Sequence, residues 1–262
     1  MGSLESAVRP VPSGGRGSRA EQPDPGPPSP PGRQEAIVLI AGFPAGSFAA
    51  NCYVVAPGPG EECVIIDPGQ DSADGIEEIV ASHRLRPVAV IATHGHIDHI
   101  WSVAPVCGAR GIPAYIHPAD RALLSDPARG LSLGAGQQLF RGLTFTEPDD
   151  VRELADGTTL ELAGVRLIVD HAPGHTQGSV TFRLPGTVFS GDLLFAGSIG
   201  RTDLPGGDYQ TILDSLARVC LPLPDETVVL AGHGPRTTIG AERTGNPFLA
   251  GLTPSAGPAR GL

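Results

Sequence analysis

The sequence contains no lysine, so all 18 of its basic residues are arginines. A lysine Schiff base, a P-loop lysine and lysine-based anion binding are therefore excluded. The 28 acidic residues give a formal net charge of −10. Because contacts with phosphates need clustered cations, this balance argues against a nucleic-acid partner.

The sequence also lacks an uninterrupted apolar run of about 18 residues, the length that a transmembrane helix requires. No basic patch followed by an apolar segment is visible near the N-terminus, so no signal peptide is expected. We therefore expect a cytoplasmic protein with no membrane partner. The four cysteines form no C-x-x-C pair and are expected to be reduced, part-buried thiols. The oligomeric state leaves no signal, because no exposed apolar stripe stands out.

Three segments differ in composition. Residues 1–34 are rich in Gly, Pro and Ser and contain too few apolar side chains to offset the entropy of ordering, so a disordered tail is expected. Residues 35–250 contain the β-rich and helical patterns of one folded domain. Residues 251–262 are expected to be a flexible C-terminal tail.

The first half of the folded segment predicts a mixture of strands and helices. Three β-rich runs, A-I-V-L-I-A-G, N-C-Y-V-V-A and C-V-I-I-D-P-G, predict an antiparallel meander. Asp71 or Ser72 is expected to cap a helix that places Ile76 on its apolar face. A second helix is expected at about residues 100–110. Residues 119–151 show little periodicity and are interpreted as a mobile connection beside the site.

The second half repeats the pattern of strands and turns. The run T-T-L-E-L-A-G-V-R-L-I-V-D-H predicts a hairpin with its turn near Ala163 and Gly164. Two further strands follow in S-V-T-F-R-L and T-V-F-S. A helix is expected at about residues 209–220, before the apolar strand T-V-V-L-A.

The strongest chemical signal is T-H-G-H-I-D-H, which follows the buried-strand pattern V-A-V-I-A. Three imidazoles and a carboxylate this close together cannot all be buried without partners. A divalent metal removes the difficulty, because imidazole and carboxylate are its preferred ligands. His94 and His96 are two apart and point the same way on an extended chain, whereas Asp98 and His99 can face a second metal.

Three more polar residues follow strand patterns and are flanked by glycine: His175, Asp192 and His233. Glycine lets the backbone turn sharply and approach a metal closely. Each residue alone is weak evidence. Their shared placement at strand ends favours one common metal site.

The segments T-H-G-H-I-D-H, A-P-G-H-T, S-G-D-L-L-F and A-G-H-G-P, in this order, resemble the metallo-β-lactamase superfamily. The segments G-S-I-G-R-T-D-L-P-G-G-D and G-P-R-T-T-I-G-A-E-R-T-G-N-P-F-L are similar to those of its short glyoxalase II-like hydrolases. The resemblance implies an α/β fold, the αββα sandwich in which two facing mixed β-sheets have helices outside. It also implies a dinuclear metal centre at one edge of the sandwich.

The resemblance assigns each metal its ligands. One metal is held by His94, His96 and His175, and the second by Asp98, His99 and His233. Asp192 bridges both, and Asp98 and Asp192 act as the catalytic carboxylates. Zinc is the default metal for these ligands, although iron and manganese accept the same atoms.

The activity implied is hydrolysis of a small-molecule thioester such as S-lactoylglutathione. Two cations sharing a water lower its pKa from about 15.7 towards about 7, which gives metal-bound hydroxide at neutral pH. The penicillin-hydrolysing branch typically has Cys in place of Asp192 and Arg in place of His99, which speaks against a β-lactamase. The RNA-processing branch is longer and has an added substrate-binding arm, and this chain has neither that length nor a basic charge.

The sequence evidence for a substrate-binding residue is weaker than that for the metal ligands. Arg201 occupies the position of a cationic substrate contact in the glyoxalase II family and can bind a carboxylate with both arms of its guanidinium. A structural pairing with Asp203 is equally compatible with the sequence. Full-length glyoxalase II enzymes bind glutathione through a C-terminal extension, and this chain has no such segment after Leu249. The thiol carrier therefore stays open.

Other reaction classes remain alternatives. Persulfide dioxygenases share H-x-H-x-D-H but bind a single Fe(II) through two His and one Asp, here His94, His175 and Asp192. A lactonase and a non-catalytic metal-binding module are further possibilities. Loss of His99 or His233 distinguishes the thioester hydrolase from the dioxygenase, because only a dinuclear hydrolase depends on these two residues.

Overall fold

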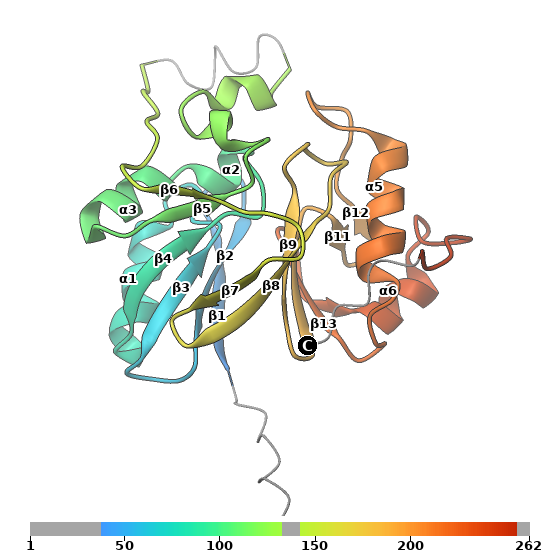
Figure 1. Cartoon of the computed structure of the whole chain (residues 1–262), viewed down its shortest axis with the longest axis horizontal. Helices are drawn as coiled ribbons and strands as arrows, with labels where there is room; N and C mark the ends of the chain where they lie inside the picture. The colour runs from blue at the N-terminus through green and yellow to red at the C-terminus, as the bar shows by residue number, and fades with distance from the viewer. Residues whose placement is uncertain (1–37, 133–141, 256–262) are drawn as a thin grey trace, which may run out of the picture. The chain divides into compact units, whose positions relative to one another are not determined.

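The computed structural model describes residues 38–132 and 142–255. The expected disordered tail of residues 1–34 lies outside the described residues, as do residues 256–262 of the expected C-terminal tail. The described strands form two six-stranded sheets and one two-stranded sheet (Figure 1).

The first sheet has the strand order β1-β2-β3-β4-β5-β6. Its members are β1 (Leu39–Ala45), β2 (Ala50–Ala56), β3 (Glu62–Ile66), β4 (Arg86–Ile91), β5 (Ala114–Ile116) and β6 (Val151–Glu153). β1, β2 and β3 pair antiparallel, which confirms the predicted meander. β3 to β6 pair parallel and so need crossovers, and α1 (Ala73–His83) and α3 (Val103–Arg110) supply those from β3 to β4 and from β4 to β5.

The second sheet has the order β14-β13-β10-β9-β8-β7. Its members are β7 (Thr159–Leu162), β8 (Val165–His171), β9 (Val180–Leu184), β10 (Thr187–Gly191), β13 (Val228–Ala231) and β14 (Thr237–Thr238). The β7–β8 hairpin turns at Ala163 and Gly164, both with positive φ, as predicted. β10 and β13 pair parallel, so their carboxyl ends meet at one edge. The small sheet pairs β11 (Leu194–Phe195) with β12 (Ser198–Ile199).

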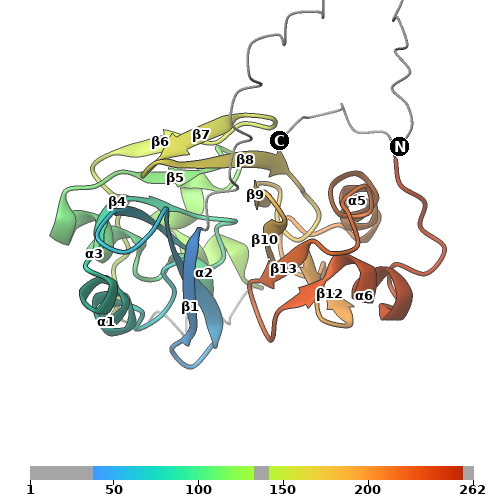
Figure 2. The same cartoon turned by 90° about the horizontal axis from the view of Figure 1, so that it is seen from below.

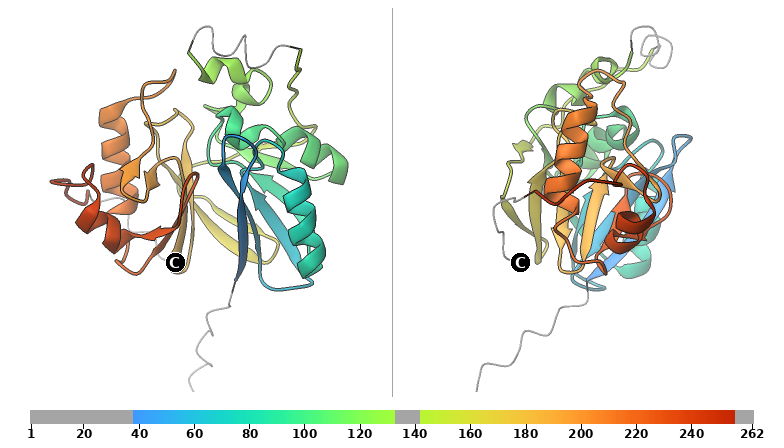
Figure 3. Two further views of the ribbon diagram at one scale, coloured as in Figure 1. Left: turned by 180° about the vertical axis from the view of Figure 1, so that it is seen from behind. Right: turned by 90° about the vertical axis from the view of Figure 1, so that its right-hand side faces the viewer.

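Three apolar layers hold these elements together. The central one packs residues of both large sheets against each other, including Ile91 of β4 and Phe189 of β10, each nearly inaccessible to solvent. One outer layer lies under α1 and α3 and the other under α5 (Tyr209–Ser215) and α6 (Ile239–Gly245). Figures 2 and 3 show these helices on the outer sides of the two sheets. The two mixed sheets with helices outside confirm the predicted αββα sandwich.

The helix predicted at about residues 100–110 is present as α3, which begins three residues later than predicted. A short α2 (Ile97–Ile100) precedes α3, and Ser102 interrupts them. The Ser102 backbone N–H donates to Pro68 O at 2.9 Å and its hydroxyl donates to Gly69 O, so this residue is tied to the turn after β3 instead of continuing the helix. Contacts distant in sequence decided this break.

The expected cap of α1 needs correction. Ser72 stands at the N-cap of α1, but its side chain makes no capping hydrogen bond. The helix predicted at about 209–220 is confirmed in its extent: it is α-helical to Ser215 and continues as a π-helical segment, Leu216–Cys220. The connection at 119–151 contains two 3-10 helices, η1 (Arg121–Leu124) and η2 (Pro127–Gly130), and part of it lies outside the described residues.

All four cysteines lie in the described part of the chain, and each is a buried free thiol. Burial raises the pKa of the Cys63, Cys107 and Cys220 thiols to about 12, which keeps them protonated and disfavours a ligand role. Within residues 38–132 and 142–255, every helix is too short or too polar to cross a membrane.

Candidate metal centre

Two histidines are placed by the end of β4. His94 and His96 follow this strand and are buried, with 1% and 5% of their surfaces exposed. Thr93, just before them, accepts a hydrogen bond at its carbonyl from Val180 N in β9 of the other sheet. The segment that follows β4 is therefore joined to the second sheet by a hydrogen bond at Thr93, and His94 is the next residue.

The parallel pairing of β10 with β13 places two more of the predicted ligands. Gly191 pairs with Ala231, and the Gly232 N–H donates to Gly191 O at 2.8 Å. Asp192 and His233 therefore leave neighbouring strands at the same edge of the sheet. This is the juxtaposition expected from the carboxyl ends of adjacent parallel strands.

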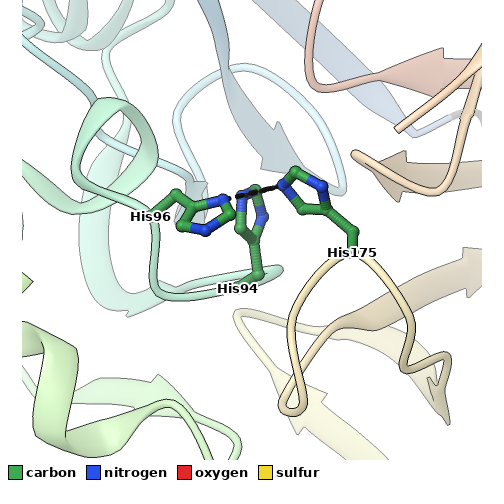
Figure 4. Close-up of side chains that lie close together, drawn as sticks. All are labelled: His94, His96 and His175. Atoms are coloured by element: carbon green, nitrogen blue, oxygen red, sulfur yellow. Dashed lines mark hydrogen bonds between the residues drawn. The ribbon is translucent and has the colours of Figure 1, made fainter. Parts of the chain in front are cut away.

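The first set of side chains consists of His94, His96 and His175. The His175 Nε2 atom lies 2.8 Å from His96 Nδ1 and 3.2 Å from His94 Nε2. Figure 4 shows the three rings pointing towards one another from two separate loops. Their nitrogens are close enough to share one metal ion.

The second set consists of Asp98, His99 and His233. The His233 Nε2 atom lies 3.0 Å from Asp98 Oδ2 and 3.3 Å from His99 Nε2. Asp192 faces both sets, with Oδ1 3.3 Å from His99 Nε2 and Oδ2 3.5 Å from His175 Nε2. The structure thus brings all seven predicted residues together, in groups whose ligand atoms lie within 4.8 Å of one another.

Hydrogen bonds on the far side of the rings fix where the imidazole protons are. His175 Nδ1 faces Arg201 O at 2.7 Å, and a carbonyl can only accept, so Nδ1 carries the proton. His99 Nδ1 faces the Asp67 carboxylate at 3.0 Å and is likewise a donor. In their neutral forms both rings therefore aim an Nε2 lone pair at the centre of the cluster.

The same reasoning extends to His94. The Thr93 hydroxyl donates to Asp67 Oδ2 at 2.6 Å, so its oxygen is left to accept from His94 Nδ1 at 3.1 Å. Three Nε2 lone pairs then converge, and Asp192 Oδ1 is buried without a hydrogen bond of good geometry to any described residue. A cluster of lone pairs and a carboxylate oxygen without donors fits divalent cations, which would satisfy all of them.

The pKa directions of His96, His94 and Asp192 agree with this fit. Burial lowers the pKa of His96 to about 3 and also lowers that of His94, with further lowering by neighbouring histidines, so both rings are neutral. Burial alone would raise the pKa of the Asp192 carboxyl, but His99 and His175 outweigh it and lower the pKa. Neutral imidazoles and an ionised carboxylate are the protonation states that metal binding requires. Burial lowers the pKa of His99 and His233, but Asp192 and Asp98 outweigh it and raise both pKa values, an effect of the carboxylates that a bound cation would oppose.

The sequence did not reveal the residues that orient the ligands. Asp67 accepts hydrogen bonds from Thr93 and His99, although in the sequence it is recognisable only as the start of a turn. Asp120, 2% exposed, accepts from the Gly95 and Gly178 N–H groups and the Thr176 hydroxyl, and so joins the two histidine-bearing loops. Both are acids that lie next to the centre only after folding.

Gly232 leaves just enough room for the Asp192 carboxylate. A Cβ atom at this glycine would stand 2.1 Å from Asp192 Oδ1 and 2.7 Å from His99 Cε1. We expect Gly232→Ala to reduce metal content and to lower activity by about 100-fold, because small misplacements of reacting groups have effects of this size. The matched control is Gly108→Ala, where a Cβ meets nothing within 4 Å. Equal metal content in the two variants would contradict this prediction.

Asn51 holds the turn that carries His233. Its side-chain amide donates to Ala231 O at 3.0 Å and to Gly234 O at 2.9 Å, and its backbone N–H donates to Gly232 O at 2.7 Å. Replacing Asn51 by Leu keeps the size but removes both side-chain donors. We expect metal affinity at the Asp98–His99–His233 set to fall by about 10- to 100-fold, as for other groups that orient metal ligands.

A titration of metal-free protein with Zn²⁺ or Co²⁺ measures this effect. The control is Tyr53→Phe, which removes one donor, the hydroxyl that lies 2.8 Å from the same Ala231 carbonyl. We expect a smaller loss in this variant. Unchanged metal affinity at both sets of ligands in Asn51→Leu would show that the turn holds its shape without the amide.

Arg201 lies at the rim of a cavity beside the seven residues. Its side chain forms a two-armed ion pair with Asp203, at 2.7 Å from Nε to Oδ1 and 2.8 Å from Nη2 to Oδ2. The structure therefore shows the pairing that the sequence left open as an alternative. Arg201 also faces the cavity, so a substrate contact stays a prediction.

Comparison with known proteins identifies the family of the chain. The sequence model of the metallo-beta-lactamase superfamily matches residues 45–233. The protein Rv2581c of Mycobacterium tuberculosis is 51% identical over 224 residues, which are 82% of this chain and all of that protein. Hydroxyacylglutathione hydrolase GloC of Haemophilus influenzae is 32% identical over 213 residues, which are 79% of this chain and 96% of that protein.

Solved structures share the fold. BLEG-1, described as a B3 metallo-beta-lactamase, is 39% identical with a TM-score of 0.72 and covers 81% of this chain and 100% of its own. TTHA1623 in a di-iron-bound form is 41% identical with a TM-score of 0.66, covering 78% and 97%. ETHE1 from Myxococcus xanthus is 26% identical with a TM-score of 0.66, covering 81% and 85%.

Proposed function

Because this chain belongs to the metallo-β-lactamase superfamily, we propose that it is a dinuclear metal-dependent hydrolase of thioesters, with S-lactoylglutathione as the reference substrate. The observation that carries the proposal is the convergence of three Nε2 lone pairs on one carboxylate, Asp192, that faces both sets of ligands. The likeness to GloC over 96% of its length supports this substrate class.

Seven residues would hold the metals: His94, His96, His175, Asp98, His99, His233 and Asp192. When bound, two divalent metals would lower the pKa of a shared water and polarise the thioester carbonyl. We propose zinc, and iron is the other candidate because TTHA1623 is described in a di-iron-bound form.

The protein's own groups orient the imidazoles and keep the carboxylates of this site ionised. Asp67, Thr93 and the Arg201 carbonyl hold the imidazole protons on the far nitrogens. The pKa of Asp98 is lowered, since His99 and His233 outweigh the effect of burial. Asp98 and Asp192 are therefore ionised at neutral pH and can accept a hydrogen bond from the attacking water.

Hydrolysis joins the water oxygen to the carbonyl carbon and breaks the C–S bond. The attacking water gives up one proton to solvent, the sulfur leaves as a thiolate, and the acyl group becomes a carboxylic acid that loses the second proton to solvent. A thiolate needs little acid assistance, because thiol pKa values are about 8.5. The absence of a general acid among the seven residues is therefore compatible with a thioester substrate.

A second candidate is a mononuclear iron persulfide dioxygenase. It is favoured by the subset His94, His175 and Asp192, in which two imidazoles and one carboxylate already lie within contact of each other. Such a triad leaves coordination positions open for oxygen chemistry. The additional ligands His99 and His233 have no role in that reading, which is why we place it second.

The test is a substrate panel assayed with the full chain after metal loading. The panel contains S-lactoylglutathione, glutathione persulfide with oxygen uptake as the readout, and a chromogenic cephalosporin, because BLEG-1 is described as a metallo-beta-lactamase. We expect turnover of the thioester. Oxygen uptake with the persulfide and no thioester hydrolysis would overturn the proposal.

A further inference from the structure

A cavity of about 470 Å³ opens beside the metal ligands. Six apolar side chains face it from five segments of the chain: Phe48, Ile97, Leu131, Phe195, Ile199 and Leu204. Phe48, Leu131, Phe195 and Leu204 are only half-buried, so their apolar surface remains in contact with water. Such surface around a catalytic centre favours a substrate that covers it with apolar groups.

The cavity has one permanent cation among its described lining residues, Arg201. Arg201 is fixed close to the centre, because its carbonyl accepts the His175 Nδ1 proton at 2.7 Å. The Nε and Nη2 atoms of its guanidinium are already bound to the Asp203 carboxylate. The guanidinium holds the pKa of the Asp203 carboxyl down at about 2, so the pair carries both charges and no net charge at neutral pH.

An anionic substrate group at this rim would meet two obstacles. It would have to displace the Asp203 carboxylate from the Nε–Nη2 edge of the guanidinium, or bind the remaining Nη1–Nη2 edge beside it. In either case the Asp203 charge would remain nearby and repel it. An uncharged arm meets neither obstacle and gains from covering the apolar side chains.

We propose that the cavity selects thioesters whose thiol arm is uncharged and largely apolar, and that Asp203 is the residue that disfavours anionic thiols such as glutathione. The inference rests on the proposed hydrolase function and refines its substrate class. Arg201 then serves to hold Asp203 at the rim instead of binding a substrate carboxylate.

The experiment compares two thioesters with the same lactoyl group. One is S-lactoylglutathione, whose thiol is anionic, and the other is the lactoyl thioester of N-acetylcysteamine, whose thiol is neutral. For the wild-type chain we expect kcat/KM to favour the neutral thioester by about 10-fold. For Asp203→Asn we expect the ratio to shift by about fivefold towards lactoylglutathione, through KM and not kcat, and the shift to shrink at high salt.

Two further variants make the result specific. Asp149→Asn changes the net charge equally, but Asp149 lines a different cavity and is not the partner of Arg201, so the ratio should not move. Arg201→Gln in the Asp203→Asn background should remove the gain, because the freed guanidinium is what binds the anion. A structural role for Asp203 would lower kcat on both substrates and leave their ratio unchanged, which would overturn the inference.

The outcomes also separate the two proposals. Hydrolysis of both thioesters with a preference for lactoylglutathione, and a loss of that preference in Arg201→Gln, would overturn the inference and leave the hydrolase intact. No hydrolysis of either thioester by the metal-loaded chain would overturn the proposed function and this inference with it.

Discussion

Replacing Asp192 by Asn is expected to lower kcat/KM for thioester hydrolysis by about 1000-fold or more. The Asp192 carboxylate faces His99 with one oxygen and His175 with the other, and its lowered pKa keeps it ionised. The amide of Asn removes this negative charge and places an N–H₂ donor where an acceptor is needed. The loss combines poorer metal binding with poorer stabilisation of the transition state, each of which is a large term in metal-dependent hydrolysis.

Steady-state kinetics and metal content measured on the same sample check this prediction. The matched control is Asp214→Asn on α5, an exposed carboxylate that accepts only from Gln210 among the described contacts. This variant should retain wild-type activity and metal content. An Asp192→Asn protein with both metals and activity within about tenfold of wild type would show that the bridging carboxylate is not needed.

The second large effect is expected for His233→Ala. His233 belongs to the set with Asp98 and His99, so its loss should release one metal and leave the other on His94, His96 and His175. We expect about one metal per chain and a decrease in hydrolysis of about 100-fold. The fold should survive, because the His233 side chain is 30% exposed and its turn is also held by Asn51.

This variant separates the two candidate reactions. A mononuclear dioxygenase built on His94, His175 and Asp192 does not use His233, and its activity would persist in the variant. His83→Ala is a suitable control, since His83 is the last residue of α1 and lies outside all three metal-binding groups. Thioester hydrolysis at the wild-type rate with a single metal would contradict the dinuclear account.

The sequence predicted the elements that depend on local pattern. The meander, the hairpin at Ala163 and Gly164, and the strand that carries His94 follow from alternation, turn residues and a short apolar run. The convergence of seven metal-binding side chains was predictable because each one follows a strand, with glycine beside most of them. The resemblance supplied their grouping and the expectation of two facing sheets with helices outside.

The parts that the sequence did not predict depend on contacts between distant residues. The break between α2 and α3 arises because Ser102 bonds to the turn after β3, about 33 positions earlier. Asp120 gives no local signal, since its partners Gly95, Thr176 and Gly178 come from other loops. Asp67 likewise acts on His99 across the fold. Hydrogen bonds of this kind become visible only when the whole chain is placed.

The metal content of the full chain, purified both in air and without oxygen, tests the central claim most directly. The arrangement of His94, His96 and His175 on one side of Asp192, and of Asp98, His99 and His233 on the other, predicts about two divalent metals per chain. It further predicts that chelation abolishes thioester hydrolysis and that adding back two equivalents restores it. A single iron per chain, with full activity and no binding of a second metal, would contradict the account.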